Sequence, residues 1–125
     1  VSMSAVDRID MSTVMLDIKR DLTVQQRDRK PGPPERIDGM SVGVVTIEPG
    51  QSPHNGERHP DGDEILYVIS GQLILSYDTA DDPMILGAGE ACIVRRGEWH
   101  MVDCSVKTTL MHITPGPNGE ARFAE

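Results

Sequence analysis

Short runs of β-branched and aliphatic residues, separated by turn residues at intervals of about 8 to 12 positions, constrain this chain more than any other feature. The run from Met40 to Glu48 roughly alternates and stops at the turn dipeptide Pro49-Gly50. The runs 64–70 and 72–77 are joined through Gly71, which leaves no room for a helix between them. Short strands at this spacing are typical of a sandwich or barrel. The pattern therefore predicts an all-β fold.

Further short strands are expected at 84–86, 91–95, 100–104 and 107–114, before Pro115-Gly116-Pro117 ends the pattern. No window longer than a turn has convincing helical spacing. A chain of 125 residues is of ordinary size for one domain with one core. We therefore expect a single domain.

The residues before Met40 follow a different pattern. Residues 1–13 are polar and lack a sustained period, which predicts an arm with at most a short helical turn. Residues 14–20 predict a strand, and the Pro- and Gly-rich stretch 25–38 predicts a loop. The predicted division is an N-terminal arm with a strand available for swapping (1–38), a barrel (39–117) and a C-terminal tail (118–125).

The charge of the chain argues against two classes of partner. Its formal charge is -8, its pI is near 4.9, and its 12 basic residues are scattered, so a phosphate backbone or an anionic membrane surface would repel it. No apolar run approaches about 18 residues, and charged side chains interrupt the first 25 residues, where a signal peptide needs an apolar stretch. We expect no nucleic-acid or membrane partner and a cytoplasmic location.

Four side chains have the spacing of a metal site. In a strand, residues two apart project from the same face, so Glu57 and His59 would both point into a barrel while Arg58 points out. The residues from Pro60 to Asp63 have strong turn chemistry. The next strand would therefore begin at Glu64 and bring its carboxylate opposite the first pair.

His100 follows a turn at Gly97 and begins another strand, so it could complete the site from across the barrel. Two imidazoles with carboxylates suit Fe(II), Mn(II), Ni(II), Cu(II) or Zn(II) and leave positions open for substrate, water or oxygen. The ligand types do not select among these metals. The alternative is that the histidines are ordinary half-buried residues and the glutamates are solvated.

Two blocks of this sequence resemble the two motifs of the cupin superfamily. The first family motif has Gly, a spacer, His-x-His, three or four residues, Glu, six residues and Gly, and the second has Gly, five residues, Pro-x-Gly, two residues, His, three residues and Asn. The matching residues are Gly50, His59, Glu64 and Gly71 in the first motif and Gly89, Gly97 and His100 in the second. The resemblance implies a double-stranded antiparallel β-barrel of the jelly-roll type.

The sequence departs from the motifs at three positions. Glu57 stands where the first motif histidine is usual, Arg95 replaces the proline, and Cys104 replaces the terminal Asn. A second carboxylate favours harder cations such as Mn(II) or Fe(II), or it signals a barrel that has lost its metal. His54 is the other candidate for the missing histidine, if the loop curves inward; otherwise it is an exposed loop residue.

The resemblance implies a metal-dependent enzyme that acts on a small polar organic molecule by dioxygenase, isomerase, lyase or decarboxylase chemistry. Glu57 and Glu64 are its candidate catalytic carboxylates, with Glu57 as the base. A non-catalytic small-ligand-binding barrel and a purely structural barrel are the alternatives. Small cupins commonly form homodimers, and residues 14–18 could supply a swapped strand. The sequence leaves open the facing of Arg95, Tyr77 and His112.

Overall fold

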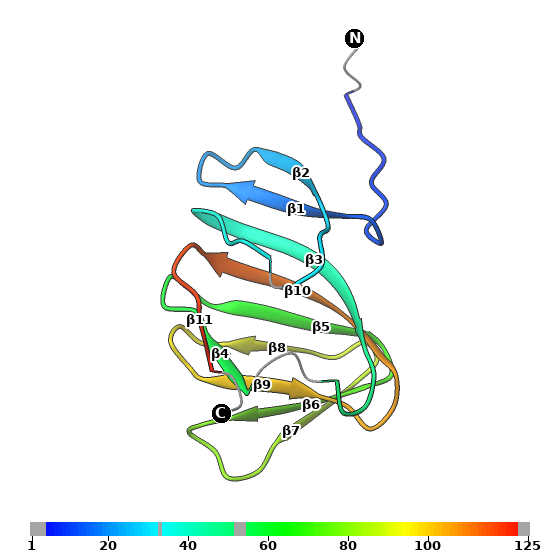
Figure 1. The fold of residues 1–125 in the computed structure, drawn as a ribbon, viewed down its shortest axis with the longest axis vertical. Coiled ribbons are helices and arrows are strands. Elements are labelled where there is room, and N and C mark those ends of the chain that lie inside the picture. Colours follow the sequence, from blue (N-terminus) through cyan, green and yellow to red (C-terminus); the bar gives the residue numbers. More distant parts are fainter. Residues whose placement is uncertain (1–4, 33, 52–54, 123–125) are drawn as a thin grey trace.

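A computed structural model describes residues 5–32, 34–51 and 55–122, and the regular structure of these residues is all β-strand. Two antiparallel sheets face each other in the jelly-roll arrangement that the sequence predicts (Figure 1). They are hydrogen-bonded as two separate sheets, not as one closed barrel, in this part of the chain. None of the described residues forms a helix able to cross a membrane.

The larger sheet has the strand order β2-β1-β3-β10-β5-β8. Its members are β1 (Val14–Lys19), β2 (Val24–Asp28), β3 (Gly39–Ile47), β5 (Glu64–Ser70), β8 (Ala91–Val94) and β10 (Thr108–Gly116). The smaller sheet has the order β11-β4-β9-β6-β7. Its members are β4 (Gly56–Arg58), β6 (Gln72–Tyr77), β7 (Met84–Gly87), β9 (His100–Asp103) and β11 (Glu120–Arg122).

The prediction of a loop over 25–38 is wrong for its first four residues, because β2 occupies Val24–Asp28. This strand is an exposed edge strand that pairs with β1 from Val14↔Asp28 to Ile18↔Val24. It lacks an apolar alternation, and backbone pairing alone defines it. The C-terminal tail likewise contains β11, which pairs with β4 and has only exposed residues.

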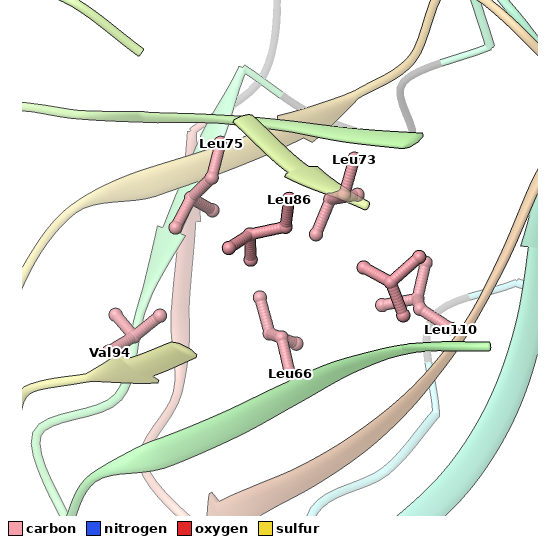
Figure 2. Packing of buried hydrophobic residues seen from close by; sticks show 7 residues of the cluster. Leu66, Leu73, Leu75, Leu86, Val94 and Leu110 are labelled. Atoms are coloured by element: carbon pink, nitrogen blue, oxygen red, sulfur yellow. The ribbon is translucent and has the colours of Figure 1, made fainter. Parts of the chain in front are cut away.

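The hydrophobic core fills one end of the space between the sheets. Alternation along β5, β6 and β10 sends every second side chain inward, and these side chains interdigitate across the two layers (Figure 2). Leu73 and Val68 have no exposed surface. The buried members of the core are Leu66, Val68, Val94 and Leu110 from the larger sheet and Leu73, Leu75 and Leu86 from the smaller sheet.

The turn from β5 to β6 requires glycine. Gly71 has φ +85°, and a Cβ at this position would lie 2.4 Å from the carbonyl oxygen of Lys107. Glycine thus lets the chain pass from the larger sheet to the smaller one in a single residue.

The other end of the space between the sheets holds a cavity of about 1040 Å³. Its walls are the inner face of β1, β3 and β10, the ends of β4 and β11, and residues 29–32 and 34–36 of the link from β2 to β3. This link crosses the face of the larger sheet (Figure 1). The inner face of the larger sheet therefore contributes to both the core and the cavity, and Leu66 and Leu110 border both.

Candidate metal centre

The four predicted ligands come from strand ends of both sheets. Glu57 is the middle residue of β4, and His59 directly follows that strand. Glu64 begins β5 of the larger sheet, and His100 begins β9 of the smaller one. Antiparallel pairing of β4 with β9 places Glu57 directly opposite His100.

One nitrogen or oxygen atom from each of these side chains lies within 4.8 Å of the other three. His100 Nε2 is 2.9 Å from Glu64 Oε1 and 3.6 Å from Glu57 Oε1. His59 Nε2 is 3.3 Å from Glu57 Oε1 and 3.4 Å from Glu64 Oε2. The structure thus brings together all four residues that the sequence singles out.

The cluster is nearly sealed from water. The side chains of His59 and Glu64 are 4% and 2% exposed, and that of His100 is 1% exposed. Glu57 keeps 24% of its side chain exposed. These values rule out half-buried histidines beside solvated glutamates. They leave Glu57 as the member of the cluster that solvent or a ligand can reach most easily.

The tautomer of His100 follows from its backbone neighbour. Its Nδ1 lies 3.0 Å from the carbonyl oxygen of Glu98, which can only accept a hydrogen bond. Nδ1 therefore carries a proton, and in the neutral ring Nε2 offers its lone pair to the cluster. A backbone carbonyl on the second ring nitrogen is the usual orientation of a metal-binding histidine.

The protonation of the cluster depends on its carboxylates. Burial by itself lowers the pKa values of His59 and His100, but hydrogen bonds and charge from Glu57 and Glu64 outweigh it and raise them to about 9 and about 10. Burial alone would raise the pKa of Glu64, whereas its histidine partners lower it to about 2. At neutral pH without metal, two imidazolium rings balance two carboxylates. A divalent cation that displaced both protons would preserve this balance, so the donor set fits such an ion.

A chain of hydrogen bonds from β10 fixes the Glu64 carboxylate. The Thr114 hydroxyl donates to Glu64 Oε2 at 2.6 Å, and His112 Nδ1 lies 2.8 Å from Thr114 Oγ1. Because the hydroxyl proton goes to Glu64, His112 must donate from Nδ1. Burial, followed by the charge of Arg36, lowers the pKa of His112 to about 4 and keeps its ring neutral.

His112, whose facing the sequence leaves open, points inward and lines the cavity. Its ring packs over Gly43, where a Cβ would lie 2.5 Å from His112 Nε2. Sequence reasoning missed Thr114 altogether. Strict alternation from Leu110 through His112 to Thr114 was the signal that could have assigned both residues to the inner face.

Arg95 and Tyr77, whose facing the sequence also leaves open, do not line the cavity. Arg95 is exposed and pairs with Asp63 at 3.1 Å, so it lies outside the cavity. Tyr77 is half-buried and packs against the core. His54 lies outside the described residues. The strand expected at residues 14–20 is β1, and it pairs with β3 of its own chain.

Sequence reasoning also missed Arg27 and Arg36, which both line the cavity. Arg27 Nη2 donates to Asp17 Oδ1 at 2.9 Å. Arg36 Nη1 is buried and has no hydrogen-bond partner in the described part of the chain. No local pattern could have found either residue, because β2 and its link to β3 reach the cavity only through tertiary structure.

Comparisons with known proteins identify the fold. A family model described as Cupin domain matches residues 43–114. A cupin superfamily protein from Desulfitobacterium hafniense DCB-2 is 18% identical with a TM-score of 0.55, and the match covers 64% of this chain and 70% of that one. Oxalate decarboxylase from Bacillus subtilis, described with Mn(II) centres, is 21% identical with a TM-score of 0.55. That match covers 66% of this chain and only 23% of that one. The comparison with curated proteins finds no match.

The protonation of the cluster predicts a pH profile for the metal-free protein. The raised pKa values of His59 and His100 add stability that is complete below their ordinary value of 6.5 and is lost as pH rises through about 9 to 10. The lowered pKa of Glu64 adds stability that is present above 4.5 and is lost as pH falls toward about 2. Urea unfolding after chelator treatment should give the highest free energy of unfolding between these limits.

The control for this profile is the double variant His59→Gln/His100→Gln. It removes the two imidazolium rings, so its stability should decline less steeply above pH 8 than that of the wild type. Parallel alkaline declines in the two proteins would contradict the assignment of raised pKa values to this cluster.

Proposed function

The chain belongs to the cupin superfamily, and from this premise we propose that it is a metal-dependent enzyme acting on a small polar organic molecule. One observation carries the proposal. Two imidazoles and two carboxylates converge within 4.8 Å, and three of these four residues line a cavity of about 1040 Å³. A cavity of this size accommodates a small molecule beside the cluster.

In this proposal the metal ligands are Glu57, His59, Glu64 and His100. Two carboxylates make the donor set harder than one of three histidines and one carboxylate, so Mn(II) or Fe(II) is favoured over Ni, Zn or Cu. The description of Mn(II) centres in the structurally similar oxalate decarboxylase agrees with this choice. When bound, a divalent cation would polarise a substrate oxygen.

The two carboxylates have different proposed roles. Glu64 is held by the Thr114 hydroxyl at 2.6 Å and by His100 Nε2 at 2.9 Å, which suits a fixed ligand. Glu57 is the most exposed member of the cluster and lines the cavity. We assign it the second role of taking a proton from the substrate.

The first prediction of this proposal concerns metal content. Wild-type protein purified without an affinity-metal column should contain close to one transition-metal ion per chain by elemental mass spectrometry. His59→Ala should reduce that content at least about tenfold, because it removes a ligand from the centre of the cluster.

The matched control is His54→Ala, which removes a histidine outside the predicted ligand set. It should retain the wild-type metal content. Loss of metal in this variant as well would assign the fourth ligand position to His54 instead of Glu57. Wild-type protein that is metal-free and cannot be reconstituted would disprove the metal centre.

The second prediction separates an enzyme from a ligand-binding barrel. With metal saturated, Glu57→Gln should lower turnover by about 100-fold or more, since the amide cannot accept the proton. Small organic acids, alcohols and ketones would be screened for oxygen uptake, carbon dioxide release and isomerisation. A metal-loaded wild type that binds a compound from this set without converting it would support the non-catalytic alternative.

We further propose that the protein is a homodimer, which the outer face of the larger sheet supports. Its side chains are apolar, although they point away from the core. Four of them are at least 36% exposed, namely Ile65, Tyr67, Ile69 and Ile93. A sheet that is apolar on both faces requires a second body to cover it, and a second copy presents the same apolar surface. The cytoplasmic location expected from the sequence stays a prediction.

Mass measurement by light scattering tests the dimer. Ile93→Glu places a charge on the outer face of the larger sheet and should give a monomer where the wild type gives a dimer. Ile85→Glu is the matched control, because Ile85 is similarly exposed at 48% but lies on β7 of the smaller sheet. A dimer that survives Ile93→Glu, or a monomeric wild type, would contradict this interface.

A further inference from the structure

We propose that Arg36 forms an anion-binding subsite in the cavity and that the ligand of this site carries a carboxylate group. Arg36 lies in the link between β2 and β3, outside the segment that matches the family model. The inference rests on the proposed function, because it names the class of molecule that would reach the cluster. Arg36 is not one of the four residues of the metal-ligand cluster, so its contacts are independent of whether the cluster binds metal.

The link that carries Arg36 is seated firmly on the sheet. A Cβ at Gly116 would lie 2.4 Å from the Ile37 carbonyl oxygen and 2.6 Å from Arg36 Cβ, so only glycine allows this approach. Arg27 Nη1 donates to the Glu35 carbonyl oxygen at 2.7 Å and holds the link from the other side. The position of Arg36 at the cavity wall is therefore built into the fold.

The cavity has unused hydrogen-bond donors. The buried side-chain nitrogens that lack a partner among the described residues are Arg27 Nε, Arg36 Nη1 and His59 Nδ1, and all three residues line this one cavity. Buried polar groups are nearly always hydrogen-bonded, and an unpaired guanidinium N–H is among the most costly exceptions. An acceptor oxygen bound at Arg36 would give its Nη1 the hydrogen-bond partner that the described residues do not supply.

Arg36 lines the same cavity as Glu57, His59 and Glu64. Burial lowers the pKa of its guanidinium, while the carboxylates of Glu57 and Glu64 act in the opposite direction. Its charge in turn lowers the pKa of His112, which lines the same cavity. A molecule bound by Arg36 would therefore share this cavity with the metal-ligand cluster.

The shape of the guanidinium favours a carboxylate. Arg27 is engaged by Asp17 at 2.9 Å, whereas Arg36 Nη1 has no hydrogen-bond partner among the described residues. A carboxylate supplies one negative charge in a planar fork that matches guanidinium, whereas a phosphate dianion would add a charge close to Glu57 and Glu64.

The test compares carboxylates with their uncharged amides. Propionate, butyrate and benzoate, each with its primary amide, are titrated into the wild type, Arg36→Gln and Arg95→Gln by calorimetry. At least one carboxylate should bind the wild type more tightly than its amide does, and Arg36→Gln should weaken that carboxylate at least about tenfold without weakening the amide. Arg95→Gln removes an exposed guanidinium and should leave the affinity unchanged.

Two further measurements keep the outcomes distinct. Arg36→Lys, which retains the charge but not the fork, should bind the carboxylate with intermediate affinity. Each titration is repeated on His59→Ala. Binding that requires Arg36 but survives in His59→Ala would support the subsite even if metal chemistry failed. Inorganic phosphate bound as tightly as the carboxylate, equal binding of acid and amide, or wild-type affinity in Arg36→Gln would overturn the proposal.

Discussion

The buried carboxylate of Glu64 is the constraint on which the rest of this site depends. Moving a carboxylate into a protein interior costs on the order of several kcal/mol, so a 2% exposed glutamate persists only with charged or hydrogen-bonding partners. Its partners come from both layers, because Thr114 donates from β10 of the larger sheet and His100 contacts it from β9 of the smaller one. The contact with His100 that stabilises this charge therefore also joins the two sheets.

The fold assigns separate regions to stability and to chemistry. Leucine side chains from both sheets pack together at the end formed by β5, β6 and β7, whereas the other end is left open between β3, β10 and the link from β2 (Figures 1 and 2). Gly43 on β3 has no side chain, and the His112 ring occupies that space. The cavity at this end has both apolar and polar lining, with Met15 and Ile47 beside Glu57 and Arg36.

The sequence predicted the cluster because its ligands obey local rules. Alternation placed Glu57 and His59 on one face, turn chemistry placed the start of a strand at Glu64, and a second turn did the same at His100. β2 and β11 escaped prediction because they are exposed strands without an apolar pattern, defined only by their partners. Arg36 escaped for a related reason, since a loop residue reaches the cavity through contacts such as that with Gly116, which no periodicity encodes.

Electroneutrality links the cluster to the remainder of the cavity. Two carboxylates require two positive charges, which two imidazolium rings supply without metal and one divalent cation would supply with it, so metal uptake and proton release are coupled. In this cavity Arg27 is engaged by Asp17 at 2.9 Å, whereas Arg36 Nη1 has no hydrogen-bond partner among the described residues. A small anion bound at Arg36 would meet a guanidinium locally, within a chain whose formal charge is -8.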